Sequence, residues 1–177
     1  MACTALGQAD ADLAATQAKL DPFLPPRETA TYNPAICLAA TGELIGLGGV
    51  FHADPAAGEL GWPEVGYMIR SEHWGKGYAT EFLRAFVPAW FALPRARVTA
   101  RVDARSAPGG HAEAGDEVPE MLCAMVEDTN VGSLRVMEKA GFRRFKTWTE
   151  VSWRPGEEGT EVTLVGFVHG GPRAKRY

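Results

Sequence analysis

The chain has 177 residues, of which 46% are hydrophobic and 23% are charged, and its formal net charge is −4. This length and composition favour one globular domain that folds without disulfides or metal, and they exclude disordered, collagen-like and coiled-coil proteins. An excess of 22 acidic over 18 basic side chains disfavours nucleic acid as a partner, because phosphate neutralisation needs a basic face.

The first third of the chain changes from a helical to an extended pattern. Apolar residues near helical spacing predict a helix within 10–24, which the pair Pro25-Pro26 ends. Alternation then predicts two strands, 36–38 and 44–51, joined by a tight hairpin at Thr41-Gly42. After a Pro/Ala/Gly-rich loop at 54–61, residues 64–69 are typical of a third strand.

The remainder alternates between helices and strands. After Gly77 one apolar stripe predicts a helix that lies against the sheet. We then expect a strand at 97–103, a mobile surface loop at 104–119, a strand at 121–126, a helix from Asn130 to Gly141, and strands at 142–153 and 161–169. With no repeat and no linker, residues 1–177 form one predicted domain.

Cysteine usage and hydropathy bear on the compartment. Cys3, Cys37 and Cys123 share no C-x-x-C spacing, so we expect neither a disulfide framework nor a metal site. The most apolar stretch, 82–93, is too short to span a bilayer, and no secretory leader opens the chain. We therefore expect a cytoplasmic protein with no membrane partner.

The segment from His73 to Thr80 carries the strongest chemical signal. A turn from strand to helix exposes the first amide N–H groups of the helix, and Gly75 and Gly77 would let an anion approach them. The segment predicts a phosphate or diphosphate site, although such turns also occur only to make the bend. Neither the P-loop nor the dinucleotide spacing fits, because Arg70 and Thr80 stand where those patterns need small residues.

Two separate motifs resemble the GNAT acetyltransferases. The first is Glu64-Val65-Gly66-Tyr67-Met68-Ile69 followed by Trp74-Gly75-Lys76-Gly77-Tyr78-Ala79-Thr80, and the second is Asn130-Val131-Gly132-Ser133 leading into Glu138-Lys139-Ala140-Gly141-Phe142. Within the family the chain is most similar to the RimJ/RimL-like branch, which acetylates protein N-termini, amino acids or small amines. The resemblance extends from about residue 32 to 170 and departs from the family at Trp74, where Gln or Arg is usual.

The resemblance implies an α/β (α+β) fold with a mixed, mostly antiparallel sheet, splayed between the strands 65–69 and 121–126 and flanked by helices. Acetyl-CoA would lie in the splay as co-substrate, its pantetheine arm on the main chain of Met68, Ile69 and Arg70. Its diphosphate would lie on the amides of the loop residues Gly75, Lys76, Gly77, Tyr78, Ala79 and Thr80. Asn130 would reach a pantetheine amide, while a plain helix N-cap explains the same residue.

Acetyl transfer to an amine needs a neutral amine, a bound oxyanion and protonation of the leaving thiolate. Alternation places Glu64 on one face with Gly66 and Met68, so Glu64 is our candidate base, with a solvated carboxylate as the alternative. An N–H near Met68 and Ile69 would bind the oxyanion. Ser133 resembles the hydroxyl that faces the CoA sulfur in this branch, which makes it a candidate acid, or else a capping serine.

The chain departs from the family at its start. Only residues 1–31 precede the hairpin, so the usual first strand is missing from the prediction, and we expect a second copy of the chain to cover the exposed sheet edge. The sequence does not identify the acceptor. Trp62 and Tyr67 are candidates to line the acceptor site, and we expect the loop 104–119 to act as a lid over it. Among Phe142, Trp148 and Trp153 we expect two core residues.

The leading hypothesis is an acetyl-CoA-dependent amine N-acetyltransferase that works by direct transfer in a ternary complex. A rival is a CoA-binding protein of this fold whose shortened N-terminus leaves no complete acceptor site. A second rival is a scaffold protein in which the glycine turn is purely structural.

Overall fold

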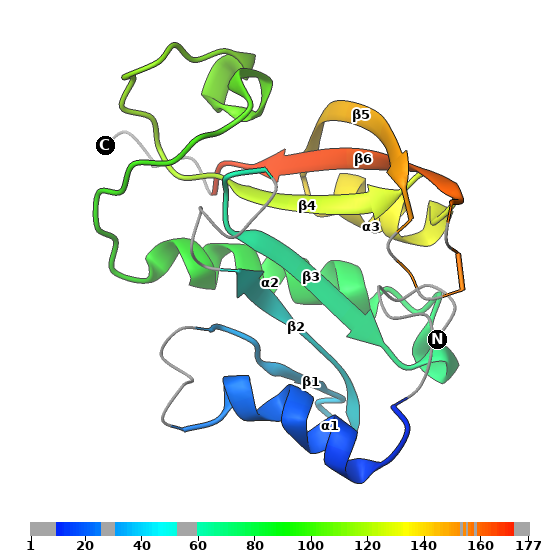
Figure 1. The fold of residues 1–177 in the computed structure, drawn as a ribbon. Helices are drawn as coiled ribbons and strands as arrows, with labels where there is room; N and C mark the ends of the chain where they lie inside the picture. The colour runs from blue at the N-terminus through cyan, green and yellow to red at the C-terminus, as the bar shows by residue number, and fades with distance from the viewer. Residues whose placement is uncertain are drawn as a thin grey trace.

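The computed structural model describes residues 10–25, 31–52, 60–152, 154, 156–157 and 159–171. These residues form a six-stranded sheet in the order β1-β2-β3-β4-β6-β5 with two helices, α2 and α3, against one face (Figure 1). The pairing of β3 with β4 is parallel and every other pairing is antiparallel. The mixed α/β class predicted from the sequence is confirmed.

The elements follow the predicted order with one exception. The strands are β1 (Ala35–Cys37), β2 (Leu44–His52), β3 (Glu64–Ile69), β4 (Leu122–Glu127), β5 (Arg143–Val151) and β6 (Glu161–His169). The helices are α1 (Leu13–Leu20), α2 (Tyr78–Ala92) and α3 (Val131–Lys139), and the short 3₁₀ turns are η1 (Asp21–Phe23), η3 (Ser71–His73), η4 (Ala104–Ser106) and η5 (Pro108–Gly110).

The sheet opens between its two central strands. β2 pairs with β3 along the whole of β3, and β4 pairs with β6 along the whole of β4. Between β3 and β4, only Glu64 and Cys123 are paired. The predicted splay is therefore present, closed at the Glu64 end and open at the Ile69 end.

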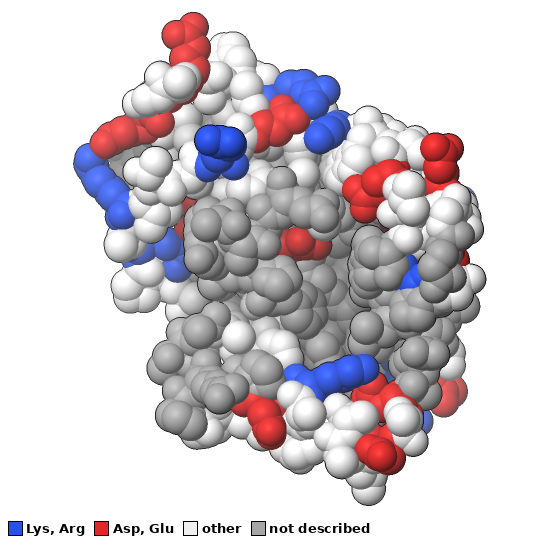
Figure 2. Space-filling model, viewed as in Figure 1, with Lys and Arg blue, Asp and Glu red and all other residues white. Residues whose placement is uncertain are grey.

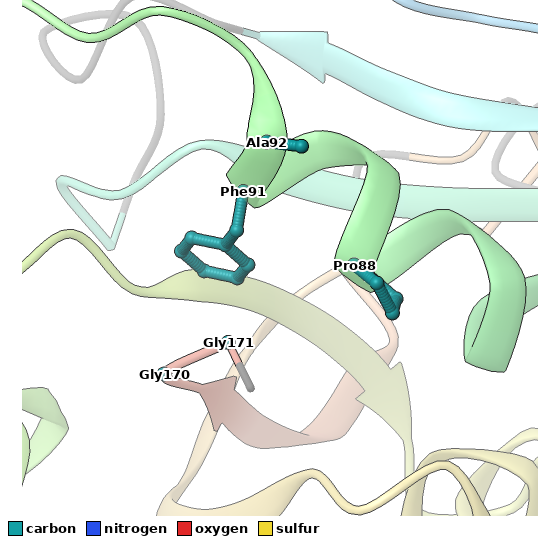
Figure 3. Close-up of a pocket in the computed structure, with 5 residues that line it drawn as sticks. All are labelled: Pro88, Phe91, Ala92, Gly170 and Gly171. Atoms are coloured by element: carbon teal, nitrogen blue, oxygen red, sulfur yellow. The ribbon is translucent and has the colours of Figure 1, made fainter. Parts of the chain in front are cut away.

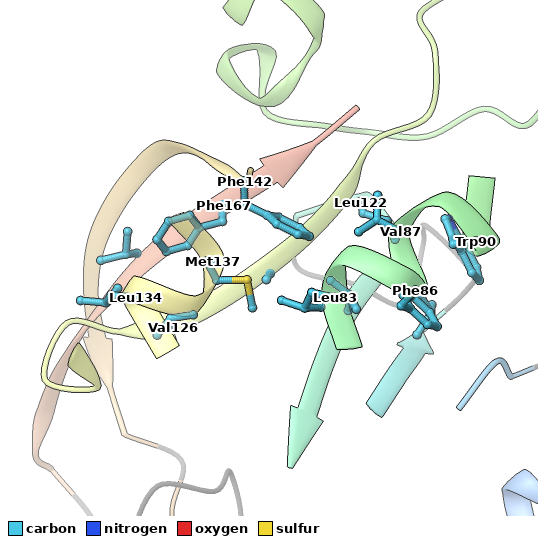
Figure 4. Close-up of a cluster of buried hydrophobic side chains, with 14 residues drawn as sticks. Leu83, Phe86, Val87, Trp90, Leu122, Val126, Leu134, Met137, Phe142 and Phe167 are labelled. Carbon is cyan, nitrogen blue, oxygen red and sulfur yellow. The ribbon is translucent and has the colours of Figure 1, made fainter. Parts of the chain in front are cut away.

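One hydrophobic cluster joins the two halves below the splay (Figure 4). The buried stripe of α2 packs against the buried residues of α3 and of the central strands, and its members include Leu83, Phe86, Val87, Trp90, Leu122, Leu134, Met137, Phe142 and Phe167. Arg84 of α2 donates a 2.9 Å hydrogen bond to the C=O of Lys139, the last residue of α3. Packing and this contact hold the two helices in fixed positions on either side of the opening.

The stretch 97–103 is not a strand, and this prediction was wrong. Its alternating residues find no partner strand: Val98 is 68% exposed, while Val102 packs against a smaller cluster on the opposite face of the sheet. The chain runs past Gly61 so closely that a Cβ on Gly61 would lie 2.0 Å from the Arg101 C=O. This segment therefore packs against the loop at Gly61 instead of pairing with a strand of the sheet.

The predicted surface loop at 104–119 contains two fully buried residues. Ser106 and Ala107 are both 0% exposed. The indole N–H of Trp62 donates a 2.7 Å hydrogen bond to the Ser106 hydroxyl, which in turn donates to the Asp103 C=O at 2.5 Å. The start of this loop is thus anchored to the sheet.

Some predictions fall outside the described residues, among them those for Cys3, for Trp153 and for parts of the segments 1–31 and 54–61. In the part that is described, β1 has a partner strand on one side only, the side of β2. Phe142 is buried at 5% exposure, and Trp148 packs at the edge of the smaller cluster.

Candidate functional site

The loop between β3 and α2 presents backbone amides to open space. Gly75 and Gly77 have φ angles of 73° and 88°, the left-handed region that favours glycine, and a Cβ at either position would have no atom within 4 Å. Gly77 is the N-cap of α2 and supplies no side-chain cap. The first-turn N–H groups of α2, including those of Tyr78, Ala79 and Thr80, lack helical partners, and the helix dipole favours an anion beside them.

Lys76 is exposed within this loop and adds a positive charge to it. Arg70 is instead engaged, by Glu43 at 3.1 Å and Glu72 at 3.7 Å. Figure 2 shows acidic and basic side chains interspersed over the described residues of the side of the molecule seen in Figure 1. Anion binding here would depend mainly on the amides and on Lys76 rather than on a broad basic surface.

The hydrogen bonds between β2 and β3 determine which backbone groups of β3 face the opening. The N–H of Arg70 donates to the C=O of Ile45 at 2.8 Å, so Arg70 and, two residues earlier, Met68 direct their backbone groups toward β2. Ile69 and Tyr67 direct theirs toward β4, which has already diverged. Of the three residues predicted to pair with the pantetheine arm, only Ile69 presents its backbone to the opening, and Tyr67 joins it.

Trp74 connects this edge to the glycine loop. Its indole N–H donates a 2.6 Å hydrogen bond to the C=O of Ile69, while the ring as a whole stays 53% exposed. A carbonyl oxygen has two lone pairs, so Ile69 keeps an acceptor position toward the opening. This bond ties Trp74, the residue before Gly75, to the last residue of β3, and so it fixes the position at which the glycine loop begins.

On the other side of the opening, α3 begins with the predicted cap. The Asn130 side-chain oxygen accepts the N–H of Ser133 at 3.0 Å, which confirms the capping interpretation of Asn130. Ser133 is partly buried in the first turn of α3. Gly141, with a φ of 91°, follows the end of the helix as predicted.

Tyr67 reaches toward this helix from β3. Its hydroxyl oxygen is buried and has no hydrogen-bond partner. Burial raises the pKa of this phenol, and the nearby Ser133 side chain acts in the opposite direction without reaching hydrogen-bond geometry. The sequence interpretation placed Tyr67 on the acceptor side, whereas it packs against the helix-side cluster.

Glu64 and Cys123 mark the closed end of the splay. Glu64 lies on the face with Gly66 and Met68, as the alternation predicted. Cys123 is 1% exposed, and its thiol donates to the Trp62 C=O at 3.4 Å. Burial, and secondly the charge of Glu64, raise the pKa of the Cys123 thiol. Cys123 therefore remains a thiol at neutral pH and offers no thiolate nucleophile.

Aromatic residues cover the sheet face opposite the helices. A Cβ on Gly166 would lie 2.8 Å from the Phe145 ring and 3.2 Å from the Trp148 ring, so the glycine lets both rings lie on the sheet. Lys146 stands over Trp148 at 4.7 Å, and the Trp148 indole donates to Glu150 at 2.8 Å. Trp62, a predicted acceptor contact, is only 6% exposed, and its indole N–H donates to the Ser106 hydroxyl.

Two surface pockets of the described residues lie away from the predicted site. A pocket of about 340 Å³ lies between the second half of α2 and the end of β6, lined by Pro88, Phe91, Ala92, Gly170 and Gly171 (Figure 3). A second, of about 260 Å³, lies between Phe23 and residues 31–34. Neither contains a residue of the glycine loop, of the open β3 edge or of α3.

A family model described as an acetyltransferase (GNAT) domain matches residues 2–143 of the chain. The chain belongs to the GNAT acetyltransferase family. Its six-stranded splayed sheet agrees with this assignment. Curated protein sequences give no significant match.

Solved structures show the same fold in other GNAT-type proteins. A spermidine N-acetyltransferase from Vibrio cholerae, in complex with CoA and spermine, is 14% identical with a TM-score of 0.61 over 92% of this chain and 77% of that one. An aminoglycoside acetyltransferase in complex with coenzyme A is 20% identical with a TM-score of 0.56 over 90% and 76%. A GNAT-family acetyltransferase from Bacillus anthracis is 18% identical with a TM-score of 0.50, and this GNAT chain spans 64% of its length.

Two further properties concern the described residues alone. No helix among them is long and apolar enough to cross a bilayer. No three of their His, Cys, Asp and Glu side chains gather in a way that could hold a metal ion.

Proposed function

We propose that this GNAT chain transfers an acetyl group from acetyl-CoA to a primary amine of a small molecule, amino acid or peptide N-terminus, as the RimJ/RimL-like motifs imply. The observation that carries the proposal is the glycine loop at the mouth of the splay. This loop contains two glycines with left-handed φ angles and open space around them, and it leads into a helix N-terminus that has no side-chain cap.

The residues present fit the coenzyme. Gly75, Lys76, Gly77, Tyr78, Ala79 and Thr80 would hold the diphosphate with backbone amides and one ammonium group. Ile69, with Tyr67, offers backbone donors and acceptors to the pantetheine arm along the open edge. The Asn130 oxygen is used by the cap, so its amide NH₂ is the part that could reach a pantetheine carbonyl.

Direct transfer needs a base for the amine and a proton donor for the leaving sulfur. Glu64 is the proposed base, at the closed end of the splay on the face opposite the helices. Ser133 is the proposed donor in the first turn of α3. The acyl C–S bond breaks as the C–N bond forms, the sulfur keeps the electron pair and gains a proton, and the amine loses one. Because Cys123 is held as a thiol, an acetyl-enzyme on this cysteine is disfavoured.

The decisive test is Gly77→Ala. The added Cβ meets no protein atom but enters the space proposed for the diphosphate. We expect CoA affinity, measured by titration calorimetry, to fall at least tenfold. A left-handed alanine costs about 1–2 kcal/mol of stability by itself. The matched control is therefore Gly115→Ala, since Gly115 also has a positive φ, 94°, and open space around it; this variant should bind CoA normally.

Thiol release from acetyl-CoA with a panel of primary amines separates catalysis from simple binding. Release that depends on the amine and is lost in Glu64→Gln supports the transferase. CoA binding without release for any amine favours the CoA-binding alternative. Equal CoA affinity in the Gly77 and Gly115 variants would refute the proposed site.

A further inference from the structure

Buried polar atoms without partners are rare in folded proteins, and each calls for a physical explanation. In the described part of the chain three side-chain atoms are of this kind, Asn33 Oδ1, Tyr67 Oη and His73 Nδ1. Leaving such a group unpaired lowers the stability of the folded state. Only the Tyr67 hydroxyl lies beside a residue already proposed to act in the reaction, Ser133.

The position of Tyr67 along the splay is informative. The opening is closed at the Glu64–Cys123 pair and runs along β3 to Ile69, after which the chain leads into the glycine loop, and Tyr67 lies between Glu64 and Ile69. A ligand arm that starts at the loop and follows the free edge of β3 inward passes Ile69 and then reaches Tyr67. Its inner end would therefore lie near Tyr67 and, across the opening, near Ser133.

The burial and the protonation state of the Tyr67 hydroxyl suit it to donate a hydrogen bond. Tyr67 points to the helix side of the sheet and packs against the main cluster, which excludes water from its hydroxyl. Burial raises the pKa of the phenol, so it keeps its proton through the neutral range. In a water-poor site a donor of this kind stabilises a developing negative charge more strongly than it would in water.

We infer that Tyr67 is a further ligand-contacting residue of this site, whose hydroxyl donates a hydrogen bond to the sulfur of the coenzyme. The inference rests on the proposed function, because it needs CoA in the splay. Tyr67 retains its proton throughout and stabilises the sulfur as a thiolate, while Ser133 remains the proposed proton donor. The unpaired hydroxyl of the free protein is then a binding group kept ready for its ligand.

The test uses the full-length protein, CoA and the variant Tyr67→Phe. The matched control is Tyr32→Phe, since Tyr32 packs against the same cluster but contacts Phe86 and Trp90 instead of Ser133. Ultraviolet absorbance of the thiolate, followed against pH, reports the pKa of the bound CoA thiol. We expect Tyr67→Phe to raise that pKa by about one unit, a tenfold shift within the range of one charge-assisted hydrogen bond, and Tyr32→Phe to leave it unchanged.

Thermal unfolding of the ligand-free variants gives a second, independent measurement. Tyr67→Phe removes an unpaired buried hydroxyl, so its melting temperature should equal or exceed that of the parent chain. A clear loss of stability would mean that the hydroxyl has a structural partner and would overturn the inference. So would an unchanged thiol pKa in a variant that binds CoA, which leaves the proposed function standing. If the parent chain itself binds no CoA, the proposed function fails and this inference fails with it.

Discussion

The hydrogen bond from Trp62 to Ser106 anchors a long connection to the sheet, and its removal has a calculable effect. Both residues are buried, at 6% and 0% exposure, and the indole N–H has the Ser106 hydroxyl as acceptor at 2.7 Å. Ser106→Ala leaves that N–H buried without a partner, which costs about 1–3 kcal/mol. For a chain of this size, about 2 kcal/mol lowers the melting temperature by roughly 4–8 °C.

Urea unfolding followed by circular dichroism measures this free energy. Ser71→Ala is the control, because Ser71 is exposed and its hydroxyl bonds the exposed Glu72; its change should stay within about 0.5 kcal/mol. In Trp62→Phe the donor is absent, so a subsequent Ser106→Ala should cost less than it does in the parent chain. Equal costs in both backgrounds, or a Ser106→Ala variant as stable as the control, would refute the claim that this bond holds the loop.

Two other predictions follow from contacts near the splay and at the end of β6. Trp74→Phe keeps the ring but removes the bond to the Ile69 C=O, and the less ordered glycine loop should bind CoA roughly fivefold more weakly by calorimetry; unchanged affinity would show that the bond does not position the loop. Burial lowers the pKa of His169, so the unfolded chain takes up this proton more readily and stability should fall as the pH drops from about 6.5 toward the lower folded-state pKa. Unfolding free energies measured across this range should lose that part of their slope in His169→Gln, and a retained slope would contradict the assignment.

The sequence predicted those features that local periodicity or a single residue type determines. The period of two in residues 64–69 gave the bounds and faces of β3, and positive φ at Gly75, Gly77 and Gly141 follows from glycine's conformational freedom. The same period of two failed at 97–103, since alternation cannot reveal whether a partner strand exists. There the close approach at Gly61 decides the outcome.

The site shows the same division between local and long-range information. The capping role of Asn130 was readable from its place before a helix. The unpaired Tyr67 hydroxyl, the Trp74 bond to Ile69 and the burial of Trp62 all depend on contacts between separate elements. A signal for Trp74 did exist, because tryptophan stands where the family has Gln or Arg, and an indole N–H that becomes buried usually finds a hydrogen-bond acceptor.

The free edge of β3 consists of peptide groups, which every amino acid carries. A ligand that binds to these peptide groups can still bind when almost any side chain of the strand is substituted, provided that β3 still diverges from β4. Natural variation can therefore reshape the aromatic face around Gly166 and Trp148 without disturbing the free edge of β3, which we propose receives the donor. This chain shares its fold with a spermidine N-acetyltransferase at 14% identity and with an aminoglycoside acetyltransferase at 20% identity, so most of its side chains can change while the fold is kept.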